Sequence, residues 1–193
     1  MATAGAEGAR CFFSRTRRTS AGELGYQESS RATIAVMLFL IFKYIVAACA
    51  VIIVLAYMRT LQVEHGEVSA QFRAGVVPSP LPDGLYKGSV NGYQASWLGK
   101  KFDPATQSGI NLFSSVDKTL VERYPFATSV GPDKLDPSVA VMRIDYNIPA
   151  NPFWLRPVLD EIVEVAPGQY LGKLLVRAIP GFPFALTYFR LEK

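Results

Sequence analysis

The feature that most constrains this chain is an apolar run from Thr33 to Met58, TIAVMLFLIFKYIVAACAVIIVLAYM, in which Lys43 is the only charge. At about 1.5 Å of rise per residue a helix of this length extends about 39 Å, and a bilayer core of about 30 Å needs about 20 apolar residues. A helix that is apolar on every face is either a membrane span or a fully buried core helix, and core helices of this length are rare. The run predicts a transmembrane helix over residues 32–58.

A cleaved signal peptide is an alternative interpretation of the same run. Such a peptide has a short basic leader, about 7–15 apolar residues and a cleavage site of small residues. Here residues 1–32 precede the run, and Val51 to Leu55 continues it beyond the small residues Ala48-Cys49-Ala50. We therefore interpret the segment as an uncleaved signal anchor.

The orientation of the span follows from the basic residues on its two flanks. Five arginines precede it, whereas only Arg59 and Arg73 follow within reach. The positive-inside rule then predicts a cytoplasmic amino terminus and an extracytoplasmic carboxy-terminal domain. An Arg-rich, Ser-containing leader leaves an organelle membrane open as the location.

Lys43 stands inside the predicted span. A lysine at mid-helix costs about 2.5–3.5 kcal/mol on insertion scales, whereas fourteen Leu, Ile, Val and Phe residues favour insertion by about 4–8 kcal/mol in total. The helix is therefore expected to insert, with the ammonium reaching the headgroups on its apolar stem. The alternative is a contact with an acidic residue of another membrane helix or with a lipid phosphate, so Lys43 is the candidate residue for a membrane lipid or a membrane-complex partner.

Three further segments are expected. Residues 1–31 are rich in Ala, Gly, Ser, Thr and Arg without periodicity, which is typical of a disordered basic tail. Residues 59–82 combine a juxtamembrane helix with the extended, proline-rich linker PSPLPDG. Residues 83–193 form the carboxy-terminal domain.

The carboxy-terminal domain alternates in polarity with a period of two. In VAVMRIDYNI, Met142, Ile144 and Tyr146 share one face, opposite Arg143 and Asp145. Such short runs are separated by Pro- and Gly-containing turn signals, as in antiparallel barrels and sandwiches. The pattern predicts a mainly β fold, a small antiparallel barrel behind one transmembrane helix.

Motifs for nucleotides and phosphate do not fit. Gly99-Lys100 would belong to a phosphate loop only with a Gly five residues earlier and a Ser or Thr directly after, and the chain has Gln94 and Lys101 there. The charge of the domain is nearly balanced, which argues against a nucleic-acid partner.

The carboxy-terminal domain lacks the residue types that metal sites and nucleophilic catalysis usually need. Its sequence contains no Cys and no His, because Cys11, Cys49 and His65 all precede it. We therefore expect no metal site, no Ser-His-Asp triad, no disulfide and no cofactor. Asp160 and Glu161 are adjacent, so on a strand they point to opposite faces, and a solvated strand edge is the preferred interpretation.

Aromatic residues crowd the domain and suggest a binding function. Small barrels either fill their interior with side chains or hold one apolar ligand. For the second case we expect Tyr86, Trp97, Tyr146 and Tyr188 as ligand-binding residues, with Arg143 as a polar anchor if its face points inward.

The chain also resembles a known family. Gly84-Leu85-Tyr86-Lys87-Gly88 is similar to the G-x-W-x-G signature that opens a small family of bacterial domains named after it, and Trp97 to Phe102 is similar to the W-x-G-K-x-F that follows. Four later segments resemble the companion domain of unknown function that usually accompanies it: Asp145-Tyr146, Asp160-Glu161-Ile162, Leu171-Gly172-Lys173 and Tyr188 to Glu192.

The resemblance implies a lipocalin-like (calycin) barrel without established catalytic residues. Gly84 and Gly88 would be structural residues where the barrel closes, and Tyr86 replaces the Trp of the signature. The resulting hypothesis is a membrane-anchored barrel that binds a lipid or another small hydrophobic molecule. The alternatives are a structural or accessory subunit of a membrane complex, and an isomerase- or hydratase-type enzyme, which needs convergent polar side chains inside the barrel.

Overall fold

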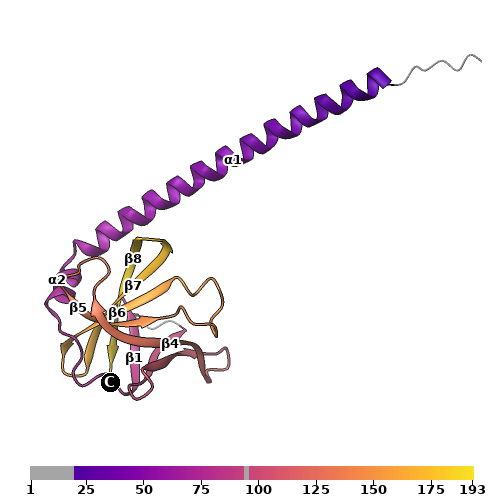
Figure 1. Ribbon diagram of the computed structural model, residues 1–193. Helices are drawn as coiled ribbons and strands as arrows, with labels where there is room; N and C mark the ends of the chain where they lie inside the picture. The colour runs from indigo at the N-terminus through magenta and orange to yellow at the C-terminus, as the bar shows by residue number, and fades with distance from the viewer. Residues whose placement is uncertain (1–19, 94–95) are drawn as a thin grey trace, which may run out of the picture. The chain divides into compact units, whose positions relative to one another are not determined.

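The computed structural model describes residues 20–93 and 96–193, and it divides into two compact units, Met1–Ala50 and Val51–Lys193. Helix α1, Ser20–Glu64 (Figure 1), contributes residues to both units. It begins inside the segment for which we expected disorder, because extending an existing helix through ordinary helix-forming residues costs less than nucleating one. The remainder of the predicted tail lies outside the described residues.

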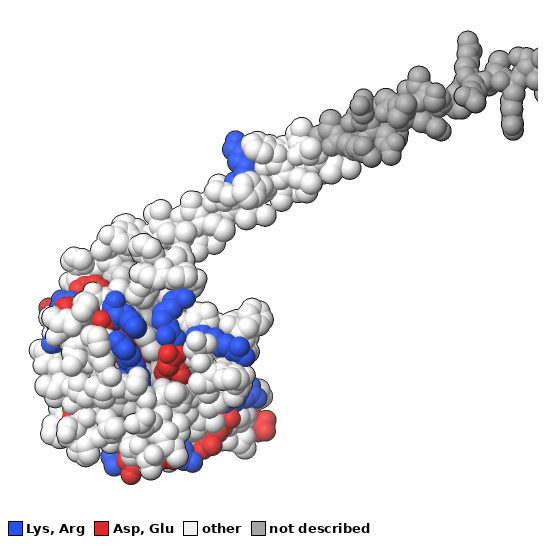
Figure 2. Space-filling model, viewed as in Figure 1, with Lys and Arg blue, Asp and Glu red and all other residues white. Residues whose placement is uncertain are grey.

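Helix α1 contains a stretch, Thr33–Glu64, that is long and apolar enough to cross a membrane. The side chains of residues 33–55 are exposed, and Figure 2 shows their surface almost entirely white, with a single basic side chain. The prediction of one apolar helix able to span a bilayer is confirmed. Because a signal sequence passes the same test, the anchor, its sidedness and the role of Lys43 stay predictions.

Eight antiparallel strands follow and close into a barrel in chain order, with the last strand paired to the first. This confirms the predicted mainly β fold, and closure leaves no open sheet edge. The strands are β1 Gly84–Val90, β2 Trp97–Asp103, β3 Ser108–Ser114, β4 Leu120–Pro132, β5 Ala140–Asp145, β6 Val158–Ala166, β7 Gln169–Ile179 and β8 Phe182–Glu192.

The outer face of the barrel is covered on one side by the last turns of α1 and by α2, Glu67–Ala74, which ends at Gly75. Phe72 of α2 is fully buried in a cluster with side chains of β5 to β8. The end of α1 is fixed to β8 by two hydrogen bonds: Arg59 Nε donates to the Leu186 carbonyl at 2.8 Å, and the Ala185 N–H donates to Thr60 Oγ1 at 3.0 Å.

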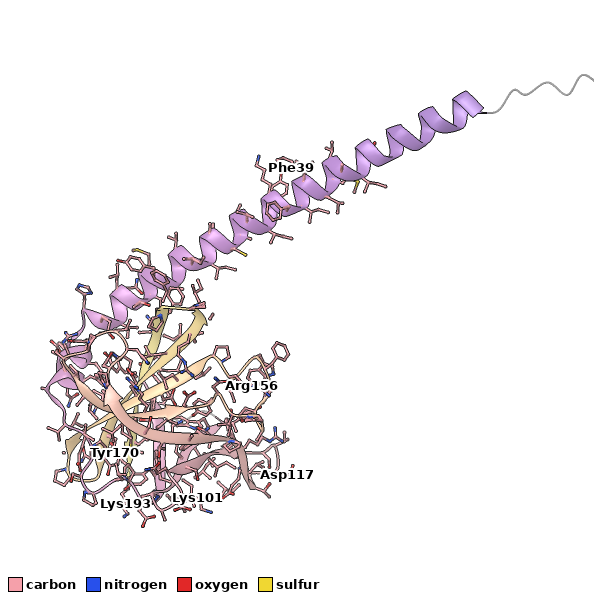
Figure 3. All side chains as sticks on the ribbon, viewed as in Figure 1. Phe39, Lys101, Asp117, Arg156, Tyr170 and Lys193 are labelled. Atoms are coloured by element: carbon pink, nitrogen blue, oxygen red, sulfur yellow. The ribbon has the colours of Figure 1, made fainter. Side chains whose placement is uncertain are left out.

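The barrel has two different ends. The loop end comprises the connections β1–β2, β3–β4, β5–β6 and β7–β8, and the base end comprises the other three connections and the end of the chain. Figure 3 shows Asp117 and Arg156 on the loop-end side, and Tyr170 and Lys193 on the opposite side. Aromatic rings fill the interior toward the base end, where Tyr86 packs against Phe102 and Tyr170.

Candidate functional site

A cavity of about 340 Å³ occupies the interior toward the loop end. This volume is within the range of about 300–1,000 Å³ that is usual for small-molecule sites. Its lining is mostly apolar, with a small group of polar side chains on β2, β3 and β6. The lining residues are Val90, Trp97, Lys100, Asn111, Phe113, Tyr124, Tyr146, Leu155, Val158, Asp160, Leu174, Thr187 and Phe189.

The polar group is centred on Lys100, which is 2% exposed. Its ammonium donates to Asp160 Oδ2 at 2.8 Å, to Asn111 Oδ1 at 2.9 Å and to the Tyr146 hydroxyl. Asn111 Oδ1 also accepts from Trp97 Nε1 at 3.1 Å. All three ammonium protons therefore have acceptors, as a buried cation requires.

Strand parity brings these residues together. Lys100 pairs with Asn111 across β2 and β3, and Asp160 lies opposite both Ile144 and Leu174 in the neighbouring strands. Since facing residues on neighbouring strands share one side of the sheet, each of these side chains points into the barrel.

Aromatic rings surround the lysine. Nζ of Lys100 lies 5.1–5.4 Å from the ring centres of Trp97, Phe126, Tyr146 and Phe189. Desolvation lowers the pKa of Lys100, and the neighbouring Asp160 carboxylate offsets part of this effect. Desolvation also raises the pKa of the Tyr146 hydroxyl well above its usual value, so this hydroxyl stays protonated.

One acceptor in the cluster is free. Asp160 Oδ1 is buried and has no hydrogen-bond partner among the described residues. The cluster is electrically neutral whether the proton lies on Lys100 or on Asp160. It therefore offers an acceptor for a hydroxyl or N–H, but no net charge to compensate a charged group.

The predicted ligand-binding residues separate into three groups. Trp97 and Tyr146 line the cavity. Tyr86 points into the interior but lies in the packed half near the base end, against Phe102 and Tyr170. The other two lie outside the barrel.

Arg143 and Tyr188 require a correction, because both point to the outer face. Each is one residue away from an inward-facing neighbour, Ile144 and Phe189, and so has the opposite parity. Arg143 lies 3.8 Å from Glu161, and the Tyr188 hydroxyl donates to Glu64 of α1 at 3.2 Å. Neither residue lines the cavity: Tyr188 contacts the helices, whereas Arg143 stays on the barrel and also donates to the Pro132 carbonyl.

The interpretation of Asp160 and Glu161 as a solvated strand edge is wrong. They do point to opposite faces, but both faces are covered, and the two residues are 3% and 0% exposed. Asp160 enters the cavity, while Glu161 lies beneath the helices and accepts a hydrogen bond from the Lys134 N–H at 3.0 Å. Asp160 has the same parity as the buried Ile162, and this parity is the signal in the sequence for its burial.

Gly88 and Gly84 occupy positions that other residues would strain. A Cβ on Gly88 would overlap the Trp97 ring and lie 2.9 Å from the Cα of Gly99. Gly84 has a φ of +81°, which favours glycine at the start of β1. Their predicted structural role at barrel closure stays a prediction.

We expect Gly88→Ala to lower the free energy of unfolding by about 1–3 kcal/mol, because the methyl group pushes Trp97 toward the cavity. Gly66→Ala is the control for steric overlap, since a Cβ there meets nothing within 4 Å, and its expected loss is at most about 1 kcal/mol, from the poorer N-cap of α2. Denaturant unfolding of the detergent-solubilised chain measures both. Equal losses in the two variants would show that Gly88 has no steric role.

Comparisons with known proteins identify no family. No family model matches the chain, and no curated protein matches it. Among solved structures, the chain is similar to a protein from Thermomonospora curvata known from its crystal structure, with 17% identity over 62% of this chain and 79% of that chain and a TM-score of 0.44. The described residues also contain no group of three His, Cys, Asp or Glu side chains able to hold a metal ion.

Proposed function

We propose that the barrel binds one small apolar molecule that carries a neutral hydroxyl, and that α1 holds it at a membrane. The observation that carries the proposal is the apolar cavity of about 340 Å³ lined by Asp160, whose buried Oδ1 has no hydrogen-bond partner among the described residues. A hydroxyl can donate to this oxygen, while the rest of the molecule contacts apolar side chains.

The neutrality of the cluster makes the proposal specific. A carboxylate or phosphate in this cavity would place a second anion beside Asp160, and an amine would place a second cation beside Lys100. Since Lys100 and Asp160 already compensate one another at 2.8 Å, either charge would be desolvated without a partner. Apolar alcohols are therefore favoured over fatty acids and amines.

The test compares naphthol with naphthoic acid on the full chain in detergent. We expect naphthol to bind at least about tenfold more tightly, a difference of about 1.4 kcal/mol, because only the carboxylate brings an uncompensated charge. Leu174→Trp should abolish naphthol binding by filling the cavity, whereas Val130→Trp, at an exposed position of β4, should leave it unchanged. Preference for the acid, or binding that survives Leu174→Trp, would reject the proposal.

The Lys100–Asp160–Tyr146 cluster also favours a second candidate, an isomerase or hydratase. These side chains converge inside the barrel, and an amine, a carboxylate and a phenol within hydrogen-bonding distance can move a proton on a bound molecule. The experiment is to incubate the chain with an apolar enone in deuterated water. Deuterium incorporation that Lys100→Met abolishes would favour an enzyme, and its absence would leave the binding function.

A further inference from the structure

The loop end of the barrel carries a set of exposed large apolar side chains. Three of its four connections contribute at least one, the first residue of β8 contributes another, and all are exposed by more than half of their surface. These residues, which we name the apolar rim, are Tyr93 (79%), Val116 (100%), Phe153 (83%), Trp154 (56%) and Phe182 (67%).

The base end is different. None of the connections β2–β3, β4–β5 and β6–β7, all within the described residues, carries an exposed large apolar side chain. Asp103 and Asp136 instead organise two of these turns through hydrogen bonds to their own loops. Leu85, near the start of β1, is an exposed large apolar residue at this end, but it stands outside the connections. Among the connections, exposed large apolar side chains therefore concentrate at the loop end.

Residues 51–64 of α1, which form one compact unit with the barrel, lead away from it on the side of this rim. Arg59 of α1 hydrogen-bonds to Leu186 near the start of β8, and Gln71 of α2 hydrogen-bonds to Arg190 near its end. The helix thus runs along β8 from the β7–β8 turn toward the base end. Residues 51–58 of α1, which belong to the same compact unit as the barrel, therefore extend from it at the loop end.

The charge and residue types of the rim fit a lipid interface. The four loop-end connections contain Asp117 as their only acid, against the bases Lys118 and Arg156. Trp and Tyr concentrate at membrane–water interfaces, and basic residues beside them are attracted to anionic headgroups. Trp154 also packs against Tyr124 of the cavity wall, with ring centres 5.8 Å apart, so the rim is continuous with the cavity lining.

We propose that the apolar rim rests on the surface of the bilayer that α1 spans, so that the cavity takes its ligand directly from the lipid phase. This inference rests on the proposed function for its membrane anchor. An alcohol dissolved in the bilayer then reaches the cavity from the loop end without crossing water.

The experiment uses the full chain in liposomes of phospholipids brominated on their acyl chains, which quench nearby tryptophan. The chain has two tryptophans, Trp97 and Trp154, so Trp154→Phe isolates the contribution of the rim. A side chain inserted about 5–10 Å into the interface lies at the acyl boundary, so Trp154 should be quenched at least about twofold more than Trp97. Adding Leu85→Trp to Trp154→Phe reports on the base end, where we expect no quenching beyond that of Trp97.

The outcomes separate this inference from the proposed function. Liposome flotation shows that the chain is inserted, and naphthol binding shows that the cavity is functional. If an inserted, naphthol-binding chain shows no extra quenching of Trp154, the rim faces water or another protein, and the inference fails while the proposed function stands. If Trp154 is quenched but naphthol does not bind, the rim contact stands and the proposed ligand fails. A chain that does not float overturns the inference as well as the anchor.

Discussion

Replacing Lys100 with methionine is expected to lower the free energy of unfolding by about 3–5 kcal/mol, the usual cost of removing one partner of a buried ion pair. Methionine keeps an unbranched apolar side chain, so the loss comes mainly from the abandoned partner. Asp160, 3% exposed, would lose its cation in an apolar cavity, while Asn111 and the Tyr146 hydroxyl would lose their donor.

Lys101→Met is the matched control, because this neighbouring lysine points outward. Its ammonium lies 3.1 Å from Glu122, and both side chains are about half exposed, so the expected loss is at most about 1 kcal/mol. The double variant Lys100→Met/Asp160→Asn should lose less than the sum of its single changes, because neither charge is then left alone. Denaturant unfolding of the full chain in detergent measures these three variants and the single change Asp160→Asn. Equal losses for Lys100 and Lys101 would contradict the buried cluster.

Much of the barrel could be predicted from the sequence, because strand parity is visible in it. Met142, Ile144 and Tyr146 have one parity, which the structure turns inward, and the Pro- and Gly-containing turns separate the strands. In a closed barrel every strand pairs with a neighbour on both sides. A residue that points inward on one strand therefore predicts that the residues facing it on both neighbouring strands also point inward.

The candidate site was only partly predictable. Trp97 and Tyr146 could be found as aromatics, but Lys100 and Asp160 read as surface charges because charged residues are rarely buried. The missed signal is local: Lys100 has the parity of Phe102, and Asp160 that of Ile162. Their pairing depends on β2 and β6 facing one another across the interior, which no local pattern contains.

The covered outer face was equally hidden, since it depends on where the helices pack. Arg143, Glu161 and Tyr188 alternate with inward residues and therefore look exposed in the sequence. The docking of α1 and α2 buries this face and brings Glu64 within 3.4 Å of Lys173. Because the helices cover the outer face, the outward side chains of β6 are buried as well as the inward ones. This explains the nearly continuous run of buried residues in β6.

Stability is expected to decrease by about 3 kcal/mol as the pH rises from about 4.5 to about 7, through the single carboxyl of Glu161. Desolvation beneath the helices, and then the Asp133 carboxylate, raise the pKa of Glu161 to about 7, although Lys173 and Arg143 oppose the shift. The ordinary value is 4.5, so between these two values the folded chain holds a proton that the unfolded chain has released. The contribution of Glu161 to stability is therefore greatest at the acidic side of this window. An ion-paired carboxylate has a lowered pKa and would contribute most at the basic side.

Glu161→Gln should remove this dependence, because the amide is neutral at every pH and its oxygen can still accept from the Lys134 N–H. The variant should match the wild type near pH 5 and exceed its free energy of unfolding by about 3 kcal/mol near pH 8. Glu122→Gln is the control, since that side chain is 45% exposed, and it should keep the wild-type slope. Unfolding measured between pH 4.5 and 8 decides the matter: if Glu161→Gln keeps the same slope, the proton is held by another group, and Glu161 is ionised beneath the helices.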